Sequence, residues 1–327
     1  VTNTGPTTYN VAVTGMTGTG TVVASINAGV ADDTAGNGNT ASTSVDNTVT
    51  FDGTGPTVTI NQAVGQADPT NASPINFTVT FSEAVSNFAT GDVTLSGTAG
   101  ASTAVVTGSG TTYNVEVSGM TGSGTVIATI AADVAADLSG NLNAASTSSD
   151  NIVNHDVTRP TVTVEQAIGQ ADPTNLSPIH FTVEFSKPVT GFTAADVVLS
   201  SGVATVSGTG TTYDISVSSM NQGPLTASIP AGAATDAVGN TSLASTSSDN
   251  VVVYDTVAPT VTINQATGQA DPTNVSPIHF TVVFSEPVSG FTSAGLTLSS
   301  GTATVTGSGT TYDVAVSGMV QGILTAV

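Results

Sequence analysis

The chain contains no cysteine and no tryptophan, and only two of its 327 residues are basic. Without cysteine there is no disulfide bridge, no thiolate metal site and no cysteine nucleophile. Two basic side chains cannot supply the Lys/Arg footprint that nucleic acid requires, nor an electrostatic attraction to anionic lipid. No run of about 18 consecutive apolar residues occurs, which argues against membrane insertion of this segment. Nucleic acid and the membrane are therefore not expected as partners.

What the chain has in excess is acid. It carries 23 Asp and Glu residues and a formal net charge of −21, with 35 glycines and 39% hydrophobic residues. The hydrophobic content is enough to bury cores. Carboxylates are the oxygen ligands that hard divalent cations prefer, so the acidic excess suits calcium.

Internal repeats organise the sequence. The segment that begins at Pro56 recurs in closely similar form from Pro160 and from Pro259, and a Thr-Thr-Tyr motif occurs four times at a spacing of roughly 100 residues. A period of this length matches an autonomous domain. We predict the C-terminal part of a repeat (1–52), two complete repeats (53–156 and 157–255) and the N-terminal part of another (256–327). No signal peptide is recognisable at Val1, and we expect the sequence to be an excerpt of a longer protein.

Each repeat shows the periodicity of β-strands. Residues 75–81 alternate strictly between apolar residues (Ile75, Phe77, Val79 and Phe81) and polar ones, as a half-buried strand does. Similar patterns predict strands around Val58, Val93, Tyr113 and Val126, and a more polar strand over Ser146–Asn154. Turn signals separate them, including Gly108-Ser109-Gly110. About seven short strands per repeat predict an all-β fold of tandem immunoglobulin-like β-sandwich domains.

Three separated motifs resemble a known family. They are Phe-Ser-Glu-Pro-Val at 284–288, Thr-Asp-Ala-Val-Gly-Asn at 235–240 and Tyr-Asp-Thr-Val-Ala-Pro-Thr-Val at 254–261. In this order they resemble the bacterial Ig-like repeats of large surface adhesins, such as the extender domains of biofilm-associated proteins and other type I-secreted fibres. The resemblance implies a secreted or cell-surface stalk, often stiffened by calcium at the domain junctions.

The residues themselves also point to calcium. If successive strands reverse direction, the N-terminal end of repeat two gathers Asp52 from the linker with Glu83, Asp137 and Asn141. Three carboxylates and an amide oxygen from separate segments suit the six to eight oxygen ligands of calcium. At the later junctions the far-end loop of the preceding repeat is predicted to contribute, with Asp68 and Asn71 facing Asp156, Asp236 and Asn240 at the second, and Asp172 and Asn175 facing Asp255 and Glu286 at the third.

Two observations weigh on this calcium prediction. Asp-x-x-Gly-Asn is also an ordinary turn, in which Asp and Asn bond to their own backbone without a metal. Lys187 stands where the neighbouring repeats have Glu83 and Glu286. An ammonium group cannot ligate a cation, and it could itself neutralise Asp156 or Asp236. We therefore expect weak calcium binding, or none, at the second junction.

Catalytic sites are not expected. His155, His180 and His279 lie in repeat-variable positions and form no cluster for zinc or for a Ser-His-Asp triad. Only 5% of residues are aromatic, too few to line a glycosidase cleft. The leading hypothesis is a structural extender whose partners are neighbouring repeats. The alternatives are a subunit of a self-assembling filament or surface layer, in which identical chains associate, and a carbohydrate-binding accessory region of a secreted enzyme.

Overall fold

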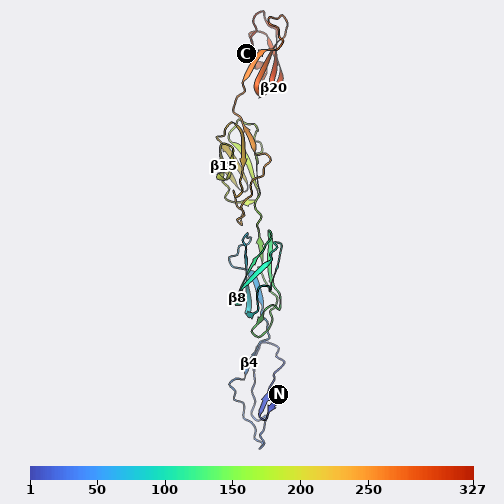
Figure 1. Ribbon diagram of the computed structural model, residues 1–327, viewed down its shortest axis with the longest axis vertical. Coiled ribbons are helices and arrows are strands. Elements are labelled where there is room, and N and C mark those ends of the chain that lie inside the picture. Colours follow the sequence, from blue (N-terminus) through green and yellow to red (C-terminus); the bar gives the residue numbers. More distant parts are fainter.

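The computed structural model describes residues 1–327 and arranges them as a thin rod of four units placed end to end, with the termini at opposite ends (Figure 1). We refer to residues 1–52, 53–156, 157–255 and 256–327 as units 1 to 4. No helix is long and apolar enough to cross a membrane. The fold is all-β, as predicted, and the strands form small antiparallel sheets.

Unit 2 shows the complete sandwich. One sheet has the order β10-β6-β5, with β8 pairing to β6, and the other has the order β11-β9-β7. The strands are β5 (Val58–Gln62), β6 (Ile75–Ser86), β7 (Val93–Ser96), β8 (Thr103–Ser118), β9 (Gly124–Ile130), β10 (Ala136–Asp137) and β11 (Ile152–His155). The alternation over 75–81 is confirmed, because Ile75, Phe77, Val79 and Phe81 are all buried in β6.

The long strand β8 folds back on itself as a β-hairpin. The Ser102 amide donates to the Ser118 carbonyl at 3.1 Å, so the two ends of β8 lie side by side. The reversal falls at the predicted Gly-Ser-Gly turn, where Gly108 has φ 118° and Gly110 has φ 72°. A Cβ at Gly108 would lie 2.6 Å from the Thr112 carbonyl oxygen, so only glycine fits there.

Two strands differ in extent from the prediction. The sequence predicts that the second strand ends at Phe81, but β6 continues to Ser86 through a register shift between Thr80 and Val85. The extra residues form a bulge, which leaves Glu83 outside the regular ladder and lets Val85 pair with Asp137.

The last predicted strand is shorter than expected, because β11 covers only Ile152–His155. The preceding residues bond alternately to the two sheets. Ser146 N donates to Ile130 O of β9 at 2.9 Å, and Thr147 N donates to Val58 O of β5 at 3.0 Å. A segment that crosses between the sheets in this way cannot form a ladder with either.

Unit 3 repeats this architecture, with sheets β12-β13-β15 and β14-β16-β17. Its elements are β12 (Val162–Gln166), β13 (Ile179–Val189), the 3-10 turn η1 (Ala194–Asp196), β14 (Val198–Leu199), β15 (Val203–Ser218), β16 (Gly223–Ser228) and β17 (Val251–Tyr254). The cores of units 2 and 3 hold 18 and 17 buried residues and share none.

Units 1 and 4 carry parts of the same sandwich. Unit 1 has β1 (Thr2–Gly5), β2 (Thr8–Asn10), β3 (Gly20–Val23) and β4 (Thr48–Phe51); unit 4 has β18 (Val261–Gln265), β19 (Ile278–Val288), η2 (Ser293–Gly295) and β20 (Thr302–Ser317). Val261 is 54% exposed, whereas Val58 at the same repeat position is 1% exposed. Unit 4 therefore buries a smaller core than units 2 and 3.

An aromatic trio lies in each of units 2, 3 and 4. In unit 3, Phe185, Phe192 and Tyr213 meet edge to face, with ring centroids 5.2–5.8 Å apart. The Tyr213 hydroxyl donates to the Val189 carbonyl oxygen at 3.1 Å, at the end of the strand bulge. The predicted core role of the tyrosine is confirmed, and its hydroxyl ties β15 to the bulged end of β13.

Removing this hydroxyl should have a modest, local effect. We expect Tyr213→Phe to lower the free energy of unfolding of unit 3 by about 1 kcal/mol, because a buried hydrogen bond is lost. This loss is measured by urea unfolding, monitored through the transition of unit 3. Tyr9→Phe is the matched control, since Tyr9 occupies the same motif position but is 58% exposed. An equal loss in both variants would contradict the assignment.

Candidate metal site at the first joint

The predicted site residues lie where consecutive units meet. We call the linker around Asp52 joint 1, that around Asp156 joint 2 and that around Asp255 joint 3. At each joint the linker aspartate is held by a polar side chain of the preceding unit. Thr19 Oγ1 donates to Asp52 Oδ1 at 2.7 Å, Ser123 Oγ to Asp156 Oδ1 at 3.3 Å, and the Gln222 amide to Asp255 Oδ1.

The loop that carries Asp137 is shaped by a buried asparagine. Asn143 is 1% exposed, and its Oδ1 accepts from Val134 N and Ala135 N at 2.9 and 2.8 Å. Its Nδ2 donates to Ala131 O and Ala144 O at 2.9 and 2.7 Å. All four of its hydrogen-bonding positions are thus satisfied, and the loop is closed around it.

Asp137 lies in the tight turn that this loop presents to the joint. Its Oδ1 accepts from Ser139 N at 2.8 Å and from Asn141 N at 2.9 Å, as in an Asx turn. Gly140 provides the φ of 90° that the turn needs. Asp137 therefore does form the ordinary turn that its sequence pattern allows, and within this turn its carboxylate still lies at the joint.

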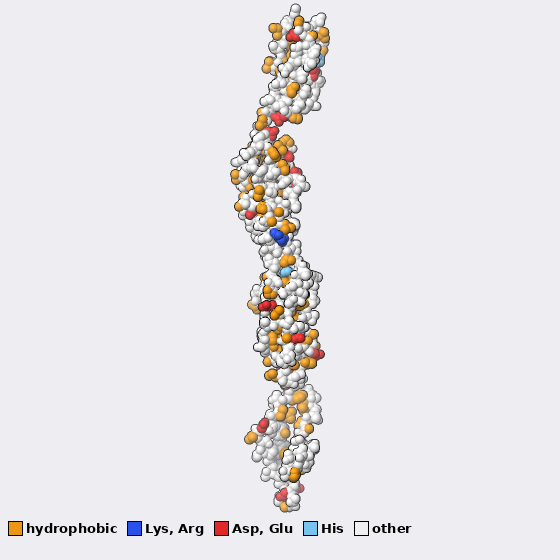
Figure 2. All heavy atoms as spheres, in the orientation of Figure 1, with side chains coloured by type: hydrophobic (Ala, Val, Ile, Leu, Met, Phe, Trp, Pro, Cys, Tyr) orange, Lys and Arg blue, Asp and Glu red, His pale blue; other side chains and the backbone are white.

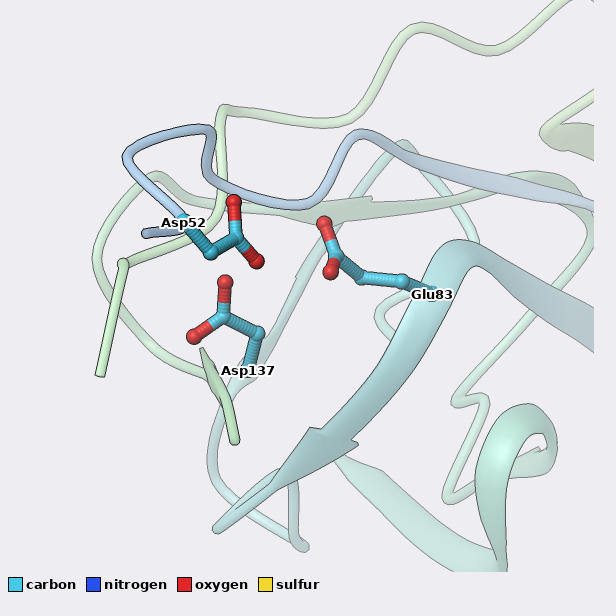
Figure 3. Close-up of side chains that lie close together, drawn as sticks. All are labelled: Asp52, Glu83 and Asp137. Atoms are coloured by element: carbon cyan, nitrogen blue, oxygen red, sulfur yellow. The ribbon is translucent and has the colours of Figure 1, made fainter. Parts of the chain in front are cut away.

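Three carboxylates converge at joint 1. Asp52 comes from the linker, Glu83 from the bulge of β6 and Asp137 from the loop, and each offers an oxygen within 4.8 Å of the other two (Figure 3). This is the chain's one group of three or more potential metal-ligating Asp, Glu, His or Cys side chains at that spacing. The three chain segments are separated in the sequence, so the sandwich topology brings them together.

The pKa values at joint 1 reflect this crowding. Burial, together with the charges of Asp137 and Asp52, raises the pKa of Glu83 above its usual value. Burial also tends to raise the pKa of Asp137. Hydrogen bonds from the Asn141 side chain and from nearby backbone amides outweigh this effect, so the pKa of Asp137 lies below its usual value. Asp137 therefore stays ionised at neutral pH, and it opposes the ionisation of Glu83.

Asn141 is placed as a donor rather than as an oxygen ligand. Its Nδ2 donates to Asp137 Oδ2 at 2.9 Å and to the Asp52 carbonyl at 3.1 Å. The side chain therefore ties the linker to the loop and fixes the distance between two of the carboxylates. This placement differs from the prediction from the sequence, in which Asn141 supplies an oxygen ligand to the metal.

Joint 2 has the same framework with a different third group. Lys187 Nζ lies 2.7 Å from Asp156 Oδ2 and 3.1 Å from Asp236 Oδ2, so the predicted ion pair is formed with both aspartates. Hydrogen bonding to Lys187 is the main cause that holds the pKa of Asp156 below its usual value. Burial lowers the pKa of Lys187, but its bonds to the two carboxylates outweigh this and leave it raised.

The far-end loops contribute less than the sequence predicted. Asn71 reaches across joint 2, where its Nδ2 donates to Asn240 Oδ1 at 3.3 Å. Asp68 instead accepts from Asn154 N at 2.9 Å within its own unit. Asp172 likewise accepts from Val253 N at 2.8 Å. Asp68 and Asp172 therefore each bond to the last strand of their own unit, β11 and β17 respectively.

The remaining predicted residues belong to joint 3. Asp255 Oδ1 accepts from the Gln222 side chain and from Val257 N, which lower its pKa. Glu286 lies in the β19 bulge, between the register positions of Val283 and Val288. Asn175 follows Thr174, which bridges to Tyr254 at the far end of unit 3. The structure does not bring these residues into one metal-ligating group.

The histidines have separate surroundings. His155 is buried, with Nδ1 3.0 Å from Gly122 O. His180 and His279 are about 43% and 42% exposed, and each pairs through Nδ1 with an aspartate on the neighbouring strand, Asp214 at 3.2 Å and Asp313 at 3.0 Å. These pairs were not predicted from the sequence. They are diagonal pairs, because Ser216 lies opposite His180 and Ala315 lies opposite His279 in the strand register.

The role of Arg159 was also not predicted from the sequence. Its Nε donates to Thr241 O at 2.7 Å, and a terminal nitrogen donates to Ser242 O at 2.7 Å. It thus holds the unit 3 loop that carries Asp236. The available signal was its position directly before Pro160, at the start of the repeated segment.

Comparison with known families agrees with this architecture. Residues 52–153 match the model of the bacterial Ig-like domain. The matched segment covers the whole of the unit 2 sandwich except its last strand residues, and the match supports a bacterial Ig-like repeat over these residues. Domains of this family are typically non-enzymatic and commonly extracellular or surface-exposed, which fits an extracellular structural role. A comparison with curated proteins returned no match to the chain.

Proposed function

We propose that this chain is a segment of an adhesin-like stalk, secreted or displayed on a bacterial cell surface, in which Ig-like repeats act as spacers. The single observation that carries this proposal is the linear arrangement of sandwiches with separate cores (Figure 1). Each unit contacts its neighbours through a short linker and through polar side chains rather than through a shared hydrophobic core. The bonds that cross the joints include Thr19–Thr54, Ser123–Thr158 and Gln222–Thr256. The partners of each repeat are then the repeats before and after it, and the geometry of the joints sets the stiffness of the stalk.

Calcium is the proposed structural ligand of joint 1. Three carboxylates converge there, and both basic residues of the chain lie elsewhere, at joint 2. Asp52, Glu83 and Asp137 would hold the ion, with Thr19 and Asn141 fixing the linker aspartate from either side. Burial and the charges of Asp137 and Asp52 raise the pKa of Glu83, and a cation held by the three carboxylates would favour its ionised form. An ion bound by the linker, the bulge and the loop together would fix the direction in which unit 1 leaves unit 2.

Chelation of calcium should lower the thermal stability of unit 2. A site in the millimolar to submillimolar range typical of extracellular modules contributes about 1–3 kcal/mol at 10 mM calcium. Each 1 kcal/mol moves the midpoint by about 4–8 °C for a domain of this size. We therefore expect a rise of several degrees in the unit 2 transition on adding calcium, measured by differential scanning calorimetry of the full chain.

Two variants make this test specific. Glu83→Gln should abolish the calcium-dependent shift. Glu116→Gln should keep it, because Glu116 is an exposed residue of β8 in the same unit. A wild-type transition that is the same in calcium and in chelator would remove calcium from the proposal and leave the spacer role to be tested by the shape of the particle.

A further inference from the structure

Both basic residues of the chain lie at joint 2. Figure 2 shows the Lys and Arg atoms at a single place on the visible face of the rod, between the second and third sandwiches. Lys187 bonds to Asp156 and Asp236, and Arg159 bonds to the loop that carries Asp236. The chain has 23 acidic residues and only these two basic ones, so joint 2 differs from the other joints in having positively charged side chains.

The linker aspartates of joints 1 and 2 are held in the same way. Asp52 Oδ1 accepts from Thr54 N at 3.1 Å, and Asp156 Oδ1 accepts from Thr158 N at 2.9 Å. Each also accepts a hydroxyl hydrogen bond from the preceding unit, as described above. The carboxylate that faces the joint therefore has the same origin and orientation at both places.

The loop amides also correspond. Asn240 Nδ2 donates to the Asp156 carbonyl at 2.9 Å and to Asp236 Oδ2 at 3.0 Å. Asn141 makes the same two contacts at joint 1, at 3.1 and 2.9 Å. Two of the three groups at each joint are thus a matched pair of aspartates held by a matched asparagine.

The third group is the one that differs. The bulges of β6 and β13 have the same register shift, between Thr80 and Val85 and between Glu184 and Val189. Within these bulges the corresponding side chains are Glu83 and Lys187. The Lys187 ammonium lies within hydrogen-bonding distance of both aspartates and donates to the Thr158 carbonyl at 2.6 Å as well. It contacts the oxygens that correspond to those of Asp52, Asp137 and Thr54 at joint 1.

We propose that Lys187 is the resident cation of joint 2, so that this joint keeps its geometry without a divalent ion, whereas joint 1 needs one. The proposal rests on the proposed calcium site at joint 1. It adds that the residue in the strand bulge decides which kind of cation a joint uses. A stalk built from such repeats then contains joints that respond to calcium and joints that do not, according to this one position.

Exchanging the two bulge residues tests the proposal. Calcium binding to the full chain is measured by isothermal titration calorimetry with calcium chloride. The wild type should bind one ion, Lys187→Glu two, Glu83→Lys none, and the double exchange one. The Glu83→Gln variant should also bind no calcium ion. In chelator, however, it should lack the added stability that the lysine gives to unit 2 in Glu83→Lys. In chelator, calorimetric scans should show a higher unit 2 midpoint for Glu83→Lys and a lower unit 3 midpoint for Lys187→Glu.

The outcomes separate the two proposals. If the wild type binds no calcium, the proposed metal site at joint 1 fails. If the wild type binds one ion but Lys187→Glu gains none, the proposal about the bulge position is overturned while the joint 1 site stands. Should Lys187→Glu fail to fold, Glu83→Lys still decides. A Glu83→Lys variant that is no more stable in chelator than Glu83→Gln shows that an ammonium at this position does not replace the metal.

Discussion

Replacement of Asn143 by alanine is expected to lower the free energy of unfolding of unit 2 by about 2–4 kcal/mol. The substitution leaves two amides and two carbonyl oxygens of the loop without their partner, and a buried unsatisfied polar group costs about 1–3 kcal/mol. The total stays below the sum of four such penalties because the loop can open and admit water. Chemical unfolding of the full chain, followed through the unit 2 transition, gives the value.

A local measurement distinguishes this cause from general destabilisation. The amide protons of Val134 and Ala135 donate to Asn143 Oδ1 and should be slow to exchange in the wild type. In Asn143→Ala they should exchange much faster than the amides of β6. The calcium-dependent shift should also shrink, because the same loop carries Asp137.

Two further variants control the experiment. Leu138→Ala changes an apolar side chain of the same loop that is 91% exposed, and its effect should be within about 0.5 kcal/mol. Asn143→Ser introduces the residue that unit 3 has at this position, where Ser242 is fully buried and accepts from Ala234 N at 3.3 Å. Its cost should be smaller than that of alanine. If alanine and serine cost the same and neither changes amide exchange, Asn143 does not close the loop.

The strand pattern was readable from the sequence because it is local. From Ile75 to Phe81 in β6 the apolar residues face the core and the polar residues between them face outward, so the alternation alone identifies this part of the strand. The continuation to Ser86 was not readable. Ser82 and Glu83 look like loop residues, and they stay in the strand because the residues beyond them pair with β8 and β10. A bulge is defined by its partner strands, and the sequence of one strand does not specify them.

The same distinction applies to the candidate site. Reversal of successive strands predicts Asp52, Glu83 and Asp137 at one end of unit 2, and in the structure their oxygens lie within 4.8 Å of one another. The direction in which the Asn141 amide points depends on which groups it meets, so its donor role was not predictable from spacing. Arg159 was missed because the other repeats have Gly55 and Ala258 there, and comparison of repeats reveals no pattern at such a position.

The second large effect concerns the independence of the units. Phe181→Ala is expected to lower the free energy of unfolding of unit 3 by about 3–5 kcal/mol, since it removes a fully buried ring and leaves a cavity. A loss of this size is a large fraction of the 5–15 kcal/mol that typically stabilises a domain. The unit 2 transition should not move, because the two cores share no residue. Differential scanning calorimetry of the full chain resolves the two transitions.

The reciprocal variant completes the argument. Phe77 occupies the same position in unit 2 and is also fully buried, so Phe77→Ala should move only the unit 2 transition, by a similar amount. Ile168→Ala serves as the control within unit 3, because this side chain is fully exposed and its loss should leave both transitions in place. If Phe181→Ala lowers both midpoints together, the units unfold as one body and joint 2 transmits stability between them. Separate transitions support a stalk in which one repeat can unfold under load while its neighbours stay folded.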